Sequence, residues 1–207
     1  MNTETVEEWL DALASEAPTP GGGAAAAMSA AVAAALISMV CNLTVGKPRY
    51  AEHEQTMIAA RSRADGLRRD ALALAEADAR AFSAVTAAYK LPKATEEDRQ
   101  TRTRAIQAAL ADAADVPLRT AVLAATVIEL AAEILPGANV NDISDVAVAA
   151  SSARAALDAA VLNVEVNLAA MRDEAAREDL AGRLGKHAPA AAQAEEVIAT
   201  VRERIKQ

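Results

Sequence analysis

The sequence has few aromatic residues, one cysteine and two histidines. Its 207 residues include one Trp, one Phe and two Tyr. The single cysteine, Cys41, excludes an intramolecular disulfide, and it has no basic neighbour in the sequence that would make it a nucleophile. His53 and His187 are far apart and neither stands in a metal-ligand spacing, so we predict no metal site. Two possibilities remain for the function: acid–base catalysis by a carboxylate, or a protein without catalytic activity.

Basic residues are outnumbered in this chain. Lys and Arg number 21 against 29 Asp and Glu, which gives a formal net charge of −8. Such a charge argues against nucleic acid and against an anionic membrane surface as partners. It remains compatible with a small anionic ligand, because a local basic pocket can hold one. The acidic first residues are unlike a signal peptide and the lone thiol suits a reducing compartment, so we expect a cytoplasmic protein.

Small apolar residues are what the chain has in quantity. Hydrophobic types make up 53% of it, and with so few aromatics the core must consist of alanine, valine and leucine. Alanine is the best helix former, while β-branched runs are scarce. We therefore predict an all-α fold: a single-domain helical bundle over 1–207 with long alanine-rich helices.

Hydrophobic spacing and turn signals divide this bundle into helices. The segment 24–45 carries no charge and is apolar on every side, which indicates a central buried helix rather than a membrane span. Pro117 is expected to start or kink a helix. The predicted helices cover 5–15, 24–44, 51–90, 95–115, 117–135 and 144–171, and a last segment to the C-terminus with breaks at Gly182, Gly185 and Pro189.

One acid stands inside an apolar stripe of the long predicted helix 51–90. The stripe consists of Leu67, Ala71, Leu74, Asp78, Phe82, Val85 and Tyr89, at spacings of three and four. Burial of the Asp78 carboxylate would raise its pKa, which suits a general acid or base. A structural pair with a cation from another helix, or a stripe that emerges into solvent, would explain the same pattern.

A run of three glycines opens the apolar helix. Gly21, Gly22 and Gly23 stand at a helix N-terminus, where free N–H groups favour negative charge or acceptor atoms. The run has neither the spacing of a dinucleotide fingerprint nor that of a P-loop. The alternative is a helix–helix corner.

Two further groups of polar residues are candidates for ligand contacts. Asn163 and Asn167 lie four residues apart on one helical face, and an amide suits a heterocycle with alternating donors and acceptors. Interhelical hydrogen bonds would use the same pair. Lys47 and Arg49 form a basic turn that could hold a carboxylate tail, although a solvated surface turn has the same composition.

Five ordered segments resemble the formiminotransferase-cyclodeaminase C-terminal domain family. They are PTPGGGAAAA with MVCNLTVGKPRY, then ADARAF, LPKATEEDR, ADVPL, and NVNDISDVAVAA leading to LNVEVNL. The resemblance covers nearly the whole chain in the family's order. It implies an all-helical protein that pairs as a homodimer and binds a tetrahydrofolate derivative as substrate, with no covalently bound cofactor. A separate formiminotransferase would be a further partner, since this chain carries no such domain.

The resemblance implies one of two reactions. A cyclodeaminase closes the N5-formimino group onto N10, which gives 5,10-methenyltetrahydrofolate and ammonia. A cyclohydrolase hydrates the methenyl bridge to give 10-formyltetrahydrofolate. The sequence does not separate the two, because both pass through a tetrahedral carbon and need a proton relay. The alternative from another class is a non-catalytic folate-binding or helical assembly protein.

The resemblance also implies roles for individual residues. It implies that Asp78 is the catalytic acid, with Glu76 as the nearest rival on the charged face. The glycine run would face the folate, and Lys47 and Arg49 would hold its glutamate tail. The remaining family positions are candidates for pterin contacts or dimer packing: Asn139, Ser144, Asp145, Asn163 and Asn167. Asp158 and Ala138 depart from the glycines expected at their positions.

Overall fold

The computed structural model describes residues 4–206, and within them every regular element is helical. The all-α prediction is confirmed. The elements are α1 (Val6–Ala14), α2 (Gly22–Thr44), the 3-10 helix η1 (Pro48–His53), α3 (Glu54–Tyr89), α4 (Glu96–Ile134), the 3-10 helix η2 (Leu135–Gly137), α5 (Ile143–Ala170), α6 (Glu174–Gly185) and α7 (Pro189–Ile205).

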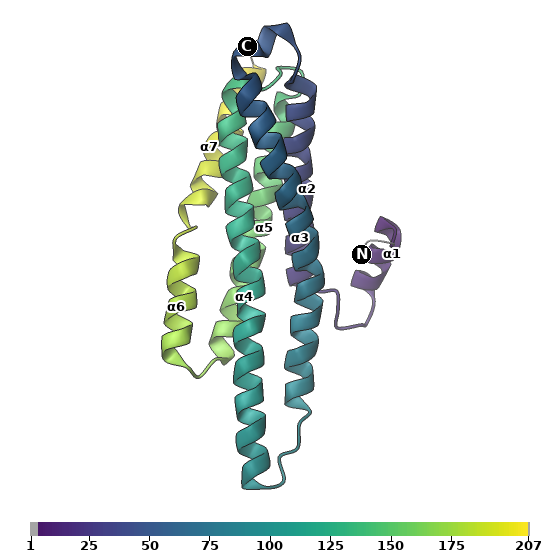
Figure 1. The fold of residues 1–207 in the computed structure, drawn as a ribbon, viewed down its shortest axis with the longest axis vertical. Helices are drawn as coiled ribbons and strands as arrows, with labels where there is room; N and C mark the ends of the chain where they lie inside the picture. Colours follow the sequence, from purple (N-terminus) through teal and green to yellow (C-terminus); the bar gives the residue numbers. More distant parts are fainter. Residues whose placement is uncertain (1–3, 207) are drawn as a thin grey trace.

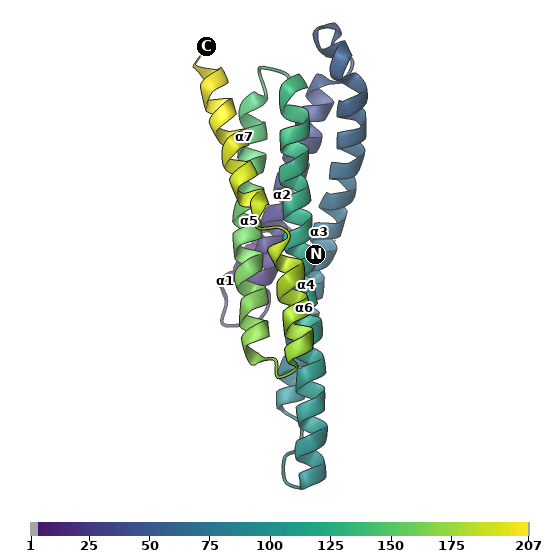
Figure 2. The same cartoon turned by 90° about the vertical axis from the view of Figure 1, so that its left-hand side faces the viewer.

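Four long helices, α2 to α5, pack side by side as the body of the molecule (Figure 1). The α3 and α4 helices run well beyond the level at which α2 begins, and together they form the far tip in both views (Figure 2). The α6 and α7 helices lie along the α4 and α5 side, while α1 stands beside the start of α2 on the opposite side (Figure 1). All four long helices are thus present at one end of the bundle. At the other end α2 is absent, because it begins further along the bundle.

The α2 helix fills the centre of the bundle because its residues are small. Its buried positions include Ala24, Ala27, Ala30, Ala33, Ala34, Ile37 and Val40. Alanines on several faces let α3 and α5 approach closely, which compensates for the few large side chains in the core. By length and composition α2 could cross a membrane, but it is the core helix of this bundle and most of its residues are buried.

Pro117 lies inside the continuous helix α4, so the expectation that it starts a separate helix is wrong. A proline has no N–H to offer the carbonyl four residues earlier, so the Ala113 oxygen lacks its helical donor. Asn167 on α5 supplies the donor instead, with its Nδ2 3.1 Å from the Ala113 oxygen. A side chain 50 residues away therefore allows α4 to run through the proline.

The complete end of the bundle is closed by hydrogen bonds around Asn139, which is 2% exposed. Its amide nitrogen donates to the Leu43 oxygen at 3.2 Å and to Asp142 Oδ2 at 2.6 Å. Its Oδ1 accepts from the Tyr50 hydroxyl at 3.2 Å, and its backbone N–H donates to Thr44 Oγ1 at 3.2 Å. Asn139 thus joins the C-terminal end of α2 to the loop before α5.

We expect Asn139→Ala to lower the free energy of unfolding by about 1–3 kcal/mol, because it leaves buried partners without hydrogen bonds. Urea unfolding followed by circular dichroism measures the change. The matched control is Asn141→Ala, since Asn141 is exposed and should change stability by no more than about 0.5 kcal/mol. Equal stability of both variants would show that the network contributes nothing.

Candidate functional site

A cavity of about 410 Å³ lies where α2 begins. Its walls come from the segment before α2 and from α3, α4 and α5, which continue past that level (Figure 1). It is lined by Pro18, Thr19, Gly21, Gly22, Gly23, Asp78, Ala81, Phe82, Val85, Leu110, Ala113, Asn163, Val166, Asn167 and Ala170. The structure therefore brings together Asp78, the three glycines and both asparagines predicted from the sequence.

The carboxylate of Asp78 is held against the first turn of α2. The Ala24 N–H donates to Asp78 Oδ2 at 3.0 Å, and free N–H groups at a helix N-terminus favour negative charge. This approach requires a glycine at position 23, because a Cβ there would overlap the Asp78 carboxylate. Gly23 is therefore the glycine of the run that the contact between α2 and α3 needs.

The pKa of Asp78 is raised above its ordinary value of 3.8, because burial disfavours the charged carboxylate. The hydrogen bond from Ala24 opposes this shift without cancelling it. Oδ2 is engaged by the backbone, whereas Oδ1 has no protein donor in the described part of the chain. A carboxylate of this kind can accept a proton and return it, which is the work of a general acid or base.

The two asparagines present oxygen atoms to the cavity. Asn167 Nδ2 donates to the carbonyls of Ala113 and Asn163, and Asn163 Nδ2 donates to the Ala159 carbonyl at 2.8 Å. Neighbouring carbonyls can only accept, so they fix which end of each amide is nitrogen. The two Oδ1 atoms remain as acceptors. Two of these bonds lie within α5 and the third ties α5 to α4, and together they set the orientation of both amides.

The remaining walls are apolar. Phe82 and Val85 line the cavity from α3, Leu110 from α4 and Val166 from α5. Phe82 is 46% exposed and Val166 71% exposed, so the apolar stripe of α3 opens onto the cavity instead of ending in the core. Phe82 was expected as a member of the stripe but not as a site residue. Its position relative to the start of α2 is what makes it one.

The other predicted contact residues lie at the opposite end of the bundle. Lys47 and Arg49 follow the C-terminal end of α2, and Asn139, Ser144 and Asp145 lie beside that end, before or at the start of α5. The α2 helix has 23 residues, so its two ends are about 34 Å apart. Within one chain, these five residues do not share the cavity with Asp78.

Asp158 and Cys41 also lie away from the cavity. Asp158 borders a separate hollow of about 380 Å³ between α5 and the C-terminal helices, and it forms an ion pair with Arg154 at 3.8 Å. Cys41 is buried in the core, and burial raises the pKa of its thiol to about 11. A thiol that stays protonated is a poor nucleophile.

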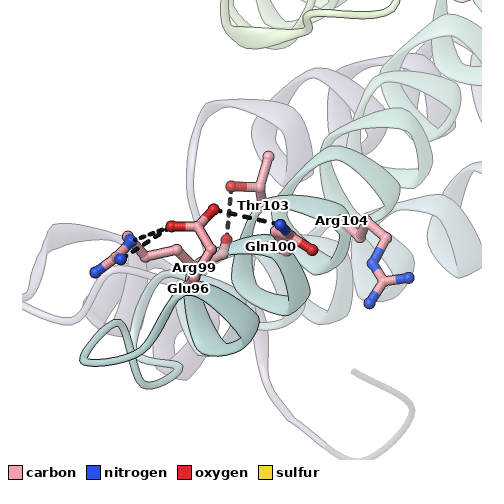
Figure 3. A pocket seen from close by; sticks show the side chains of 5 residues that line it. All are labelled: Glu96, Arg99, Gln100, Thr103 and Arg104. Atoms are coloured by element: carbon pink, nitrogen blue, oxygen red, sulfur yellow. Dashed lines mark hydrogen bonds and ion pairs between the residues drawn. The ribbon is translucent and has the colours of Figure 1, made fainter.

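A hollow on the surface of the first turns of α4 has different chemistry (Figure 3). Arg99 donates to Glu96 Oε2 at 2.9 Å, and Gln100 donates to Glu96 Oε1 at 3.3 Å. Figure 3 shows these side chains paired along one helix, with no contribution from a second element. The side chains of Glu96, Arg99 and Gln100 already satisfy one another, unlike the free oxygens around Asp78.

We expect Gly23→Ala to destabilise the protein by about 1–3 kcal/mol, because the new methyl displaces a partly buried carboxylate from its donor. In an Asp78→Ala background the same change should cost less, since the overlapping atoms are gone. Urea unfolding of wild type, the two single variants and the double variant gives the coupling free energy between positions 23 and 78. Gly22→Ala is the control, because a Cβ at Gly22 would meet Asn163 at an ordinary 3.7 Å. Equal costs of Gly23→Ala in both backgrounds would remove Asp78 from the explanation.

The chain matches known proteins along most of its length. A formiminotransferase-cyclodeaminase family model matches residues 5–186. Methenyltetrahydrofolate cyclohydrolase of Methylorubrum extorquens (strain AM1) is 46% identical over 203 residues, which are 98% of each chain. Formimidoyltransferase-cyclodeaminase of Rattus norvegicus is 34% identical over 180 residues, which are 87% of this chain and 33% of the rat protein.

A solved structure agrees with these matches. The crystal structure of formiminotetrahydrofolate cyclodeaminase from Thermotoga maritima superposes with a TM-score of 0.85 and 29% identity, over 99% of this chain and 97% of the other. The family resemblance of the five sequence segments is confirmed by the family model and the curated relatives. The chain belongs to the formiminotransferase-cyclodeaminase family.

Proposed function

We propose that the protein is a folate-dependent enzyme of one-carbon metabolism that hydrolyses 5,10-methenyltetrahydrofolate to 10-formyltetrahydrofolate. The formation of the methenyl compound and ammonia from 5-formiminotetrahydrofolate is the related activity of the same site. The observation that carries this proposal is the Asp78 carboxylate, fixed on the first turn of α2 inside a cavity with two amide oxygens. The hydrolytic reaction takes precedence because the cyclohydrolase relative matches the chain over 98% of the length of each.

The cavity suits the charge and shape of this substrate. The methenyl bridge carries a positive charge shared by N5 and N10, and Asp78 is the one ionisable side chain among the described lining residues. The pterin ring has N–H groups at its edge, and these can donate hydrogen bonds to the Oδ1 atoms of Asn163 and Asn167. Phe82 and Val166 offer apolar surface to a flat ring.

Asp78 performs the proton transfers in the proposed mechanism. It accepts a proton from water as the oxygen bonds to the bridge carbon, which gives a neutral tetrahedral intermediate. It then returns that proton to N5 as the bond between N5 and the bridge carbon breaks. The hydroxyl proton leaves to solvent as the formyl group forms on N10, so one water is consumed and one proton is released. In the cyclodeaminase reaction, Asp78 takes the N10 proton and returns one to the departing nitrogen.

The proposal includes a cytoplasmic homodimer without a covalent cofactor. The outer face of α2 supports the dimer, because it exposes Val32 at 50%, Met39 at 38% and Leu43 at 39% with no charge between them. Uncharged helical faces of this kind pack against another helix in obligate dimers. A separate formiminotransferase would supply the formimino substrate, since in the rat relative the matched region is a third of a longer protein.

Two assays with purified protein test the function. Loss of methenyltetrahydrofolate absorbance faster than the uncatalysed rate is expected and shows a cyclohydrolase. Appearance of that absorbance with ammonia release from 5-formiminotetrahydrofolate would show a cyclodeaminase. Folate binding without turnover in either assay would contradict the proposal and indicate a non-catalytic binding protein.

We expect Asp78→Asn to lower kcat by about 10²–10⁴-fold, because the amide cannot transfer a proton. Binding of the product 10-formyltetrahydrofolate, which lacks the positive charge of the bridge, should change little, since the side chain keeps its size. The control is Glu76→Gln, which alters a carboxylate of the same helix that pairs with Arg80 at 3.8 Å on the charged face. A fully active Asp78→Asn enzyme would remove Asp78 from the mechanism.

The pH profile gives an independent test of the same residue. Hydrolysis needs the ionised carboxylate, so kcat/KM should fall as pH drops through a pKa above 3.8. Stability follows the opposite trend: because folding raises the pKa of Asp78, the folded state binds the proton more tightly. Wild-type stability relative to Asp78→Asn should therefore fall as pH rises from 3.8 through the folded pKa. If the fall of kcat/KM at low pH persists in Asp78→Asn, another group is responsible for it.

A further inference from the structure

We propose that Gln107 of α4, which is not among the described residues that line the cavity, is a positioning residue of the substrate site. It holds the C-terminal end of α5 against α4, and it thereby fixes where the Asn167 oxygen meets the pterin ring. The inference rests on the proposed function, because it assigns a role in binding the substrate named there. It follows from how α5 ends and from what its last two turns carry.

The α5 wall of the cavity consists of the last two turns of that helix. Asn163, Val166, Asn167 and Ala170 line the cavity, and α5 ends at Ala170. Val166 and Ala170 are exposed, so burial does little to hold this part of the wall. Helix ends fray, and the last carbonyls of a helix have no partner within it. A wall built at a helix end therefore needs an anchor from another element.

The side chain of Gln107 supplies that anchor, because it bonds to the backbone on both sides of the helix end. Its Oε1 accepts from the Arg172 N–H at 2.6 Å, and its Nε2 donates to the Ala170 carbonyl at 3.4 Å. The shorter bond is the stronger of the two. A donor on one side and an acceptor on the other fix which end of the amide is oxygen. Figure 2 shows the chain turning from α5 into α6 beside α4.

Two amide side chains connect α4 to α5 around the cavity. Gln107 reaches from α4 to the end of α5, and Asn167 reaches from α5 to the Ala113 carbonyl at 3.1 Å. Gln107 and Ala113 are six residues apart, so the contacts lie about 9 Å apart along α4, with Leu110 of the cavity wall between them. Apolar packing has no preferred direction, whereas hydrogen bonds do. This pair of amides therefore sets the register of α5 on α4.

The position of the Asn167 oxygen depends on both contacts. The Nδ2 of Asn167 is used by the carbonyls of Ala113 and Asn163, which leaves Oδ1 for the ligand. Without Gln107, the hydrogen bonds of Asn167 alone would hold this turn on α4, and its oxygen would occupy several positions. Asp78 lies on α3 and is bound by α2, so it would keep its place. Loss of Gln107 should thus weaken substrate binding and spare the proton transfers.

The side chain of Met171 offers the alternative anchor. It is 5% exposed and belongs with Leu110 and Leu168 to one cluster of buried apolar residues. If this apolar contact alone holds the end of α5, then Gln107 is a surface residue whose replacement changes neither binding nor the order of the helix end. Variants at position 107 leave Met171 in place and therefore distinguish the two anchors.

Steady-state kinetics of these variants test the proposal. Gln107→Leu removes both hydrogen bonds at similar size, and it should raise KM for methenyltetrahydrofolate about five- to tenfold with kcat unchanged. Gln107→Glu keeps an acceptor for the Arg172 N–H, so its KM should stay within about threefold of wild type. The matched control is Gln100→Leu, because Gln100 lies two turns earlier on α4 and bonds to Glu96 of the same helix. This control should leave KM unchanged.

A double-mutant cycle and hydrogen exchange separate positioning from a general loss of stability. In an Asn167→Ala background, Gln107→Leu should raise KM by less than about twofold, because the oxygen that it positions is gone. Amide exchange over residues 168–172 should be faster in Gln107→Leu than in wild type, and unchanged in Gln100→Leu.

The outcomes separate this proposal from the proposed function. An unchanged KM in Gln107→Leu, or an equal rise of KM in both backgrounds, would overturn the positioning role. A KM in Gln107→Glu as high as in Gln107→Leu, or unchanged amide exchange in Gln107→Leu, would do the same. Absence of turnover by wild type would instead contradict the proposed function, and amide exchange would still decide whether Gln107 holds the end of α5.

Discussion

The hydrogen bond from the Ala24 N–H to Asp78 is the contact on which the site depends. It joins the first turn of α2 to the middle of α3, and it forms because Gly23 has no side chain. Burial raises the pKa of the carboxylate, while the hydrogen bond from the helix N-terminus opposes this shift and keeps the carboxylate in place. The same contact fixes where α2 begins, and the space beyond that point becomes the cavity.

A proline determines that the cavity wall on α5 presents a hydrogen-bond acceptor. Pro117 leaves the Ala113 carbonyl without its helical donor, and the amide of Asn167 turns its nitrogen toward that carbonyl. The Asn167 oxygen is then the atom left to meet a ligand. A residue that would ordinarily break a helix thus orients a side chain of the site, and one bond serves both the packing of α4 on α5 and recognition.

The fold and a large part of the site could be predicted from the sequence. The helix bounds follow from local periodicity, and Asp78 stood out as a charge within an apolar stripe. The glycine run and the two asparagines were also identified, and the structure places them around one cavity. Gly23 could not be singled out from Gly21 and Gly22, because the close approach of Asp78 involves a residue 55 positions away. Phe82 was missed as a wall residue for the same reason.

By itself, the sequence determined which residues form helices and which faces of them are apolar, because those properties depend on neighbours within one or two turns. Tertiary structure decided that α4 continues through Pro117, since the donor that compensates comes from α5. It also decided that α2 begins opposite Asp78 of α3, which turns a packed stripe into a cavity wall, and that Lys47 and Arg49 lie a helix length from Asp78. Distances between helix ends depend on how whole helices pack, and no local pattern of residues specifies them.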